Sequence, residues 1–209
     1  MKKKLFIGVY NPSIILTYIS VFCSIVGLGF LATYSESTSL NVISLCMILL
    51  AVAGVCDMFD GKVARMCKRT EKEKEFGIQL DSLADTVSFV VFPATLLMFV
   101  CNFTIFSIVV AMFYVFTGIM RLGWFNITTE ENKGFFQGLP VTMSALIFPT
   151  CYFVLRYLDK VMGNGLFIGL YLAVATLFIL NFKMKKPSLK VSLGLLGLAF
   201  VVIALFLIF

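Results

Sequence analysis

A run of 35 residues without a single charge, residues 86–120, most constrains how this chain can fold. As one α-helix the run would be about 52 Å long at about 1.5 Å per residue, whereas the hydrocarbon core of a bilayer is about 30 Å thick. One crossing cannot hold it, so we predict two membrane-spanning helices that are divided around residues 101–104. Pro93 should kink the first of these two helices.

Similar apolar runs occupy most of the remaining chain. With 60% hydrophobic and only 13% charged residues, the composition excludes an ordinary soluble domain. We therefore predict an all-α, polytopic integral membrane bundle in one domain, residues 1–209, with about seven transmembrane helices and a range of six to eight. Residues 1–12 should form an interfacial segment. The predicted spans are residues 13–34, 40–66, 77–100, 105–125, 139–158, 165–182 and 189–209.

Basic residues fall almost entirely on one side of these spans. If the N-terminus is cytoplasmic, 15 of the 17 Lys and Arg residues face the cytoplasm, and only Arg156 and Lys160 face outward. Loops rich in Lys and Arg stay in the cytoplasm, so we predict a cytoplasmic N-terminus and an odd number of spans. The net charge of +6 then reflects this bias and an attraction to anionic lipid head groups. We expect no nucleic-acid partner.

Four aspartates stand at the inner ends of two of the apolar runs. Asp57 and Asp60 are three residues apart and Asp81 and Asp85 are four apart, so each pair shares one face of a helix. Two such helices facing each other would bring four carboxylates together on the cytoplasmic side. Acids buried in a membrane are costly, and a functional role is therefore the default hypothesis.

Clustered carboxylates repel one another unless a cation neutralises them. Oxygen ligands without a nearby His or thiolate suit Mg²⁺, Mn²⁺ or Ca²⁺, and two such ions are a recurring device in phosphoryl transfer. Gly61 and Ala64 continue the stripe of Asp57 and Asp60 and leave room for a bulky ligand, while Lys62 and Arg65 can hold phosphate oxygens. Since the chain has no His, a general base must be a carboxylate, Lys, Tyr or Cys.

These residues also carry a resemblance to a known family. The pattern DxxDGxxAR followed by GxxxDxxxD is the signature of the CDP-alcohol phosphotransferases. The chain matches it at Asp57, Asp60, Gly61, Ala64, Arg65, Gly77, Asp81 and Asp85. The resemblance implies a six-helix catalytic core, here residues 13–182, with residues 189–209 as an additional helix. It also implies transfer of a phosphatidyl-type group from a CDP-linked lipid to an alcohol, release of CMP, and a homodimer.

Segments that flank this signature resemble one branch of the family. The stretches FGIQLDSLADTVSFVVFPA, MRLGWFNI and GFFQGLPVT look like the phosphatidylserine synthase branch, which implies CDP-diacylglycerol or an ether analogue as donor and L-serine as acceptor. Two features depart from that branch. Eleven residues separate Arg65 from Gly77, a longer connection than is usual in the family, and Gly123 and Trp124 stand where Ala and Arg are usual.

The resemblance assigns roles to these side chains. Asp57, Asp60 and Asp81 would bind two divalent metals, Mg or Mn with Ca as an alternative, and Asp85 would complete the metal site or act as the base on the incoming hydroxyl. The CDP-lipid would contact Gly61, Ala64 and Arg65, together with Lys62 and Asn11. Serine would be held by Arg121, Asn126 and Lys133, because its carboxylate needs a cationic or polar clamp.

Other interpretations stay open at the level of sequence. The acceptor could be inositol phosphate or glycerol phosphate, and Arg121 could be a snorkelling residue at a helix end. An acid cluster could also belong to a cation or proton transporter, or to a prenyl-transferring enzyme that binds diphosphate through Mg²⁺. A separate prediction concerns four glycines that should allow close helix packing. These are Gly54, Gly61, Gly118 and Gly123.

Overall fold

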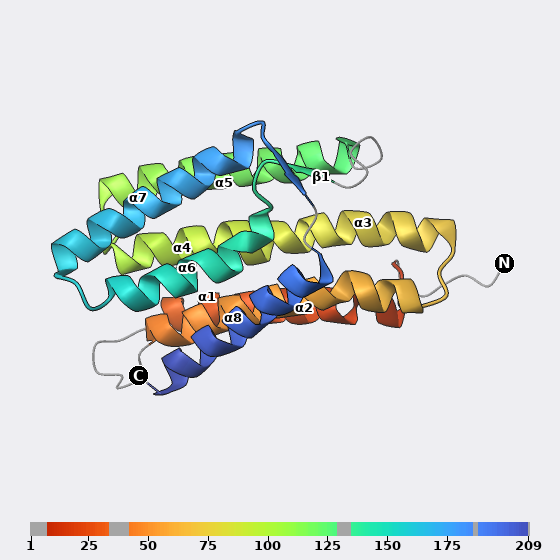
Figure 1. Ribbon diagram of the computed structural model, residues 1–209, viewed down its shortest axis with the longest axis horizontal. Coiled ribbons are helices and arrows are strands. Elements are labelled where there is room, and N and C mark those ends of the chain that lie inside the picture. Colours follow the sequence, from red (N-terminus) through yellow and green to blue (C-terminus); the bar gives the residue numbers. More distant parts are fainter. Residues whose placement is uncertain (1–7, 34–41, 129–134, 186–187, 209) are drawn as a thin grey trace.

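Long apolar helices lie side by side along one axis of the protein (Figure 1). The computed structural model describes residues 8–33, 42–128, 135–185 and 188–208. Within these parts, six helices are long and apolar enough to cross a membrane, and a shorter apolar helix spans Val141–Leu155. The helices are α1 (Ile15–Ala32), α2 (Val42–Met66), α3 (Glu71–Asp85), α4 (Phe92–Val100), α5 (Ile105–Thr128), α6 (Ser144–Leu155), α7 (Lys160–Ile179) and α8 (Leu189–Ile208). The predicted polytopic helical bundle is thus confirmed, including the break at residues 101–104.

One helix continues from Glu71 to Val100 and contains a π-helical turn, Thr86–Val91, between α3 and α4. The sequence predicts a kink at Pro93, and the π-helical turn ends two residues before this proline. Proline has no N–H, so it cannot bond the carbonyl of Phe89 four residues earlier. The hydroxyls of Tyr114 and Ser144 donate to that carbonyl instead, at 2.7 and 3.3 Å. Neighbouring helices therefore satisfy the backbone group that the proline leaves without its helical donor.

Aromatic rings hold α5, α6 and α7 together beside this helix. The rings of Phe148 and Tyr171 stack with centroids 3.7 Å apart, and Tyr114 contacts both of them edge-on. The Tyr171 hydroxyl donates to the carbonyl of Pro93 at 2.9 Å. All three rings are fully buried. This cluster fixes α4 against the later helices, so the segment just before it, which carries two of the aspartates, has a rigid support.

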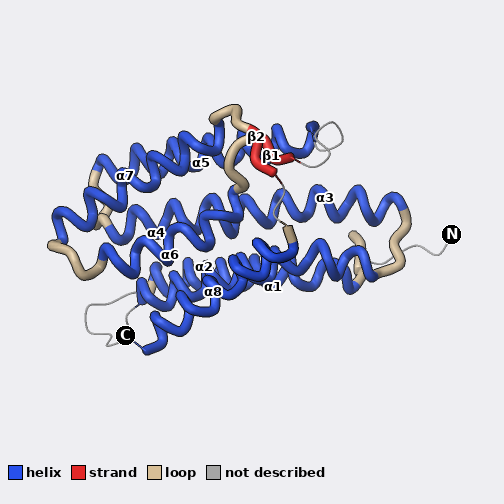
Figure 2. Tube along the Cα trace, in the orientation of Figure 1, coloured by secondary structure: helices blue, strands red, loops and turns tan. Residues whose placement is uncertain are grey.

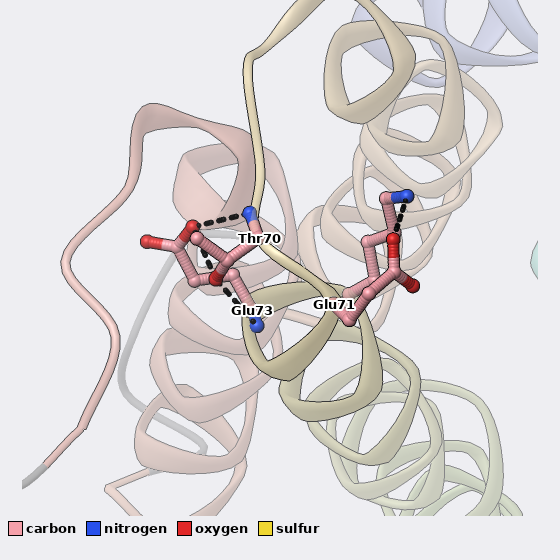
Figure 3. Close-up of polar contacts among 4 residues, drawn as sticks. Thr70, Glu71 and Glu73 are labelled. Carbon is pink, nitrogen blue, oxygen red and sulfur yellow. Dashed lines mark hydrogen bonds and ion pairs between the residues drawn. The ribbon is translucent and has the colours of Figure 1, made fainter.

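The charged stretch 67–75, which lies between two of the predicted spans, becomes helical from Glu71 onward (Figure 3). A capping box explains the start: the Thr70 hydroxyl accepts from the Glu73 N–H, and the Glu73 carboxylate accepts from the Thr70 N–H at 2.8 Å. An ion pair of 2.7 Å between Lys74 and Glu71 adds to it. The resulting 30-residue helix is about 45 Å long, so its charged first turns extend beyond a hydrocarbon core of about 30 Å.

A short antiparallel sheet was not predicted. Strand β1 (Phe135–Gln137) pairs with β2 (Lys183–Lys185), and Figure 2 shows the two strands crossing near the end of α7. After β1, the Gly138 N–H donates to Phe182 O at 2.8 Å, and Gly138 has φ of +70°. An added Cβ would lie 2.8 Å from the Phe178 carbonyl, so only glycine fits here. These contacts fasten the segment that precedes α6 to the end of α7.

The prediction of close helix packing at four glycines is confirmed for two of them. A Cβ at Gly54 would collide with Ala145 of α6, and one at Gly118 would lie 2.9 Å from Val90. The prediction is wrong for Gly61 and Gly123, where an added Cβ meets no atom of the described structure within 4 Å. Glycine at these two positions leaves open space beside the helix.

Candidate active site

Facing turns of α2 and α3 bring the four predicted aspartates together. Oxygen atoms of Asp57, Asp81 and Asp85 lie within 4.8 Å of one another. The Asp60 carboxyl interacts with that of Asp81, and the Asp57 carboxyl interacts with that of Asp85. The i, i+3 and i, i+4 spacing read from the sequence therefore does place the acids on facing helix surfaces.

Helix α1 supplies a partner that the sequence did not suggest. The Thr17 hydroxyl donates to Asp60 Oδ2 at 3.2 Å and so orients this carboxylate from the side. One turn further along, the Ser20 hydroxyl donates to that of Ser88, which lies in the π-helical turn, at 3.1 Å. A polar residue in an apolar run was the one signal available for Thr17, and such residues are common without a role.

The chemistry of this cluster fits a divalent cation. Its ligand atoms are carboxylate oxygens from Asp57, Asp81 and Asp85, the type that hard cations prefer. Asp85 is only 9% exposed, so water screens its charge poorly. Carboxylates this close in a poorly hydrated site repel strongly unless a proton or a cation lies between them.

The four aspartates open into a cavity of about 210 Å³, which we call the carboxylate cavity. It is lined by Asp57, Asp60, Asp81, Asp85, Arg121, Leu122, Phe125, Pro140, Val141 and Thr142. Arg121 of α5 is 5% exposed, and its Nε has no hydrogen-bond partner among the described residues. Its guanidinium lies over the Phe125 ring at 5.4 Å. A buried cation with an unused donor, next to four acids, is suited to bind an anionic group of a ligand.

Arg121 also borders a second pocket of about 230 Å³, which we call the Gln137 pocket. Its polar lining residues besides Arg121 are Trp124, Gln137 and Asn181. The Trp124 indole N–H donates to Gln137 Oε1 at 2.7 Å. Sequence reasoning missed both Gln137 and Asn181. Gln137 could have been found in the GFFQGLPVT stretch, whereas nothing in the sequence marks Asn181, which the β1–β2 pairing brings here.

A third cavity, of about 380 Å³, lies between α2, α6 and α8 and is called the lateral groove. It shares Asp57, Pro140 and Thr142 with the carboxylate cavity, so the two adjoin. Arg65 lines it, together with apolar residues such as Leu195 of α8. Most of its remaining lining is small or apolar, which suits the hydrocarbon part of a lipid.

The other predicted contacts for the CDP-lipid lie around α2. Gly61 is exposed and Ala64 is half-buried, and neither lines the carboxylate cavity. The Lys62 ammonium lies over the Phe59 ring at 5.0 Å. Asn11 accepts a hydrogen bond from the Ser13 N–H at 3.1 Å and donates to the Lys68 carbonyl at 3.3 Å. Asn11 thereby ties the start of the chain to the α2–α3 connection.

The three residues predicted to hold serine are not all gathered in one place. Arg121 faces the carboxylate cavity, but Asn126 accepts a hydrogen bond from the Ser82 hydroxyl at 3.0 Å, between α5 and α3. Lys133 lies outside the described residues.

Comparison with known proteins decides the family. Residues 10–207 match the CDP-alcohol phosphatidyltransferase family. The chain belongs to this family. The match covers α7 and α8 as well as the earlier helices, so it extends beyond the segments in which the sequence showed a resemblance. The chain is therefore an integral membrane enzyme of the CDP-alcohol phosphotransferase type, and its relatives use divalent metals.

The names of several relatives in this family contain serine or a serine lipid. The chain is 31% identical over 181 residues to the CDP-diacylglycerol--serine O-phosphatidyltransferase of Helicobacter pylori. This match covers 83% of the chain and 74% of the Helicobacter protein. It is 37% identical over 111 residues to the yeast enzyme of the same name, covering 48% and 39%. It is 38% identical over 106 residues to the archaetidylserine synthase of Methanothermobacter thermautotrophicus, covering 50% and 45%. The resemblance to the phosphatidylserine synthase branch is confirmed.

Proposed function

We propose that the protein transfers a phosphatidyl-type group from a CDP-linked lipid, CDP-diacylglycerol or an ether analogue, to the hydroxyl of L-serine and releases CMP. The observation that carries this proposal is one cavity in which four carboxylates meet the buried Arg121. Clustered carboxylates can bind a divalent metal that contacts a pyrophosphate. A cation beside them can bind an acceptor that bears a carboxylate. The names of the relatives support serine as that acceptor.

Two divalent metals, Mg or Mn with Ca as an alternative, would be held by Asp57, Asp60 and Asp81, and Asp85 would complete the metal site or act as the base. Bound metal would neutralise the charge of the donor's pyrophosphate and make CMP a better leaving group. The chain's own contribution is to fix the ligand oxygens in place. Thr17 does this for Asp60 through its hydrogen bond, and the π-helical turn follows directly on Asp85.

Asp85 is our candidate for the general base. It is the most buried of the four acids, and no His exists in the chain to replace it. In the proposed reaction the serine oxygen forms a bond to the donor's phosphorus, the bond from that phosphorus to the oxygen of CMP breaks, and the hydroxyl proton passes to Asp85. Positioning the hydroxyl in line with the leaving oxygen supplies the rest of the rate enhancement.

The donor would lie along α2. We place its lipid part in the lateral groove, because this groove is apolar and adjoins Asp57. Arg65 lines the groove and would hold the phosphate of the donor. The open space beside Gly61 would take the cytidine, with Ala64 one turn further along α2, and Asn11 and Lys62 lie at the same end of the bundle.

The acceptor would approach from the side of Arg121. This residue borders both the carboxylate cavity and the Gln137 pocket, so a serine carboxylate on its guanidinium would leave the hydroxyl free to face the aspartates. Gln137 and Asn181 offer amide groups for the ammonium or carboxylate of serine. Asn126 and Lys133 remain candidates for the outer part of this path. We further propose that the site faces the cytoplasm and that the protein acts as a homodimer.

A CMP-release assay tests the proposal. Purified protein is given CDP-diacylglycerol, Mn²⁺ or Mg²⁺, and one acceptor at a time: serine, inositol phosphate or glycerol phosphate. We expect metal-dependent CMP release with serine and little with the other two. Preference for another acceptor would overturn the serine assignment alone. No metal-dependent CMP release with any acceptor would overturn the proposed reaction and leave the transporter interpretation to be tested by ion flux.

A further inference from the structure

The largest of the cavities described here lies far from the aspartates. It has a volume of about 500 Å³ and is bordered by the α4–α5 turn, the α6–α7 turn and the start of α2, and both turns are at the same end of the bundle in Figure 1. We call it the outer cavity. Ile43 of α2 lines it, and Asp57 follows about 21 Å further along the same helix. The outer cavity is therefore separate from the catalytic region.

Charge distinguishes the outer cavity from an ordinary gap between helices. Arg156 and Lys160 line it, as do Asn102 and Asn164, and none of its described lining residues is acidic. The neighbouring acid, Asp159, instead accepts a hydrogen bond from the Val161 N–H at the start of α7. The cavity thus presents two cations and two amides.

The same two cations are the exceptions in the charge distribution of the whole chain. Fifteen of the 17 basic residues are predicted on the inner side, and the two on the outer side are Arg156 and Lys160. Basic residues are under-represented on the outer side of membrane proteins. Both exceptions flank the α6–α7 turn and line one cavity, so the positive charge of the outer side is concentrated there.

Contacts around Arg156 hold its side chain in a defined position. Its guanidinium donates to the Ser44 hydroxyl at 3.4 Å and to the Tyr157 hydroxyl at 2.9 Å, and it lies 4.7 Å from the centre of the Phe153 ring. Arginine held in this way loses little conformational entropy on binding an anion. Lys160 is exposed in the first turn of α7 and can reach a ligand at the cavity mouth.

The remaining lining is apolar and aromatic, with Phe99, Phe103, Tyr152 and Phe167 among its residues. Cations beside apolar and aromatic residues in one cavity match an amphiphile with an anionic head. The volume lies within the range of about 300–1,000 Å³ that is typical of small-molecule sites. At the end of a transmembrane bundle, the amphiphile at hand is a membrane lipid.

We propose that the outer cavity binds the phosphate-bearing head group of an anionic phospholipid from the leaflet opposite the carboxylate cavity. Arg156 and Lys160 contact the phosphate, Asn102 and Asn164 offer hydrogen bonds to the rest of the head group, and the aromatic residues contact the first carbons of the chains. The proposal does not depend on the identity of the acceptor or on the proposed reaction.

Lipid retention in nanodiscs or detergent tests this site. The full-length protein is titrated with phosphatidylglycerol or with phosphatidylcholine, and bound lipid is counted by native mass spectrometry. We expect phosphatidylglycerol to be retained in preference, and Lys160→Gln and Arg156→Gln each to weaken its binding about fivefold, the effect of one basic residue at a lipid surface. Lys72→Gln is the matched control, since Lys72 is exposed in the first turn of α3 at the other end of the bundle. The Lys72→Gln control should leave the retention of phosphatidylglycerol unchanged.

Arg156→Lys separates charge from packing, because it keeps the cation and loses the planar group that lies on Phe153. Retention near the wild-type level in this variant, with loss in Arg156→Gln, supports the site. Equal retention of both lipids, or wild-type retention in both Gln variants, overturns it. Inorganic phosphate that competes as well as phosphatidylglycerol would also overturn the assignment, since it would show a site for free phosphate.

Discussion

Substitution of Gly61 by leucine should separate folding from donor use. Gly61 is exposed, and an added Cβ there meets no described atom within 4 Å, so a side chain can begin at this position without a clash in the absence of substrate. Glycine inside a helix costs about 0.5–1 kcal/mol relative to alanine, and leucine is nearly as good a helix former as alanine. Gly61→Leu should therefore raise the free energy of unfolding, or leave it unchanged.

Catalysis should respond in the opposite direction. If the cytidine of the donor fills the open space beside Gly61, the leucine side chain collides with it. Overpacking by a few methylene groups costs about 1–3 kcal/mol, which corresponds to a fall of about 5- to 150-fold in kcat/KM for the CDP-lipid. Gly61→Ala should give a smaller fall in the same direction. The assay is CMP release at several CDP-lipid concentrations, beside thermal unfolding of the same preparations.

The matched control for this experiment is Gly169→Leu in α7. Gly169 is also exposed, an added Cβ there also meets nothing within 4 Å, and no proposed ligand lies near it. It should gain stability and keep full activity. Mn²⁺ binding by Gly61→Leu should match the wild type, because the change leaves the carboxylates in place. Wild-type kcat/KM in Gly61→Leu would refute the placement of the donor, and loss of Mn²⁺ binding would show that the substitution acts through Asp60 instead.

Three further predictions address the base, the acceptor clamp and the fold. Asp85→Asn should lower kcat by at least about 100-fold while CDP-lipid binding is largely kept, and lipid product formed at a near wild-type rate would contradict this. Arg121→Lys should raise the KM for serine about 10-fold or more, because lysine lacks the bidentate geometry, with the KM for the CDP-lipid unchanged; equal changes in both would argue against the clamp. Tyr114→Phe should destabilise the protein by about 1 kcal/mol in thermal or chemical unfolding, since the Phe89 carbonyl then keeps one side-chain donor, and activity should persist.

Local periodicity accounts for the parts of the site that the sequence predicted. Asp57 and Asp60, like Asp81 and Asp85, belong to single helices, and helical spacing alone decides that each pair shares a face. The break at residues 101–104 follows from the length of the apolar run, which as one helix would exceed the thickness of the bilayer core. Properties that depend on a single helix can therefore be predicted from the sequence.

Contacts between distant segments explain what the sequence did not predict. The Gln137 pocket needs β1 and β2 to pair across more than 40 residues, which brings Gln137 and Asn181 together. Thr17 reaches Asp60 only because α1 packs on α2. Glycine spacing likewise could not tell Gly54, which faces α6, from Gly61, which faces open space. Each of these outcomes depends on which helix surface meets a neighbour.

The π-helical turn Thr86–Val91 has a consequence for how sequences of this kind can vary. A π-helical turn holds one residue more than an α-helical turn, and each residue of a helix turns the chain by about 100°. Deletion of one residue there would restore α-helical geometry, and Asp81 and Asp85 would then rotate by about 100° away from α2 while α4 kept its packing. Homologues that retain the acid pair should therefore conserve the residue count between Asp85 and Pro93 more strictly than the residue types within it.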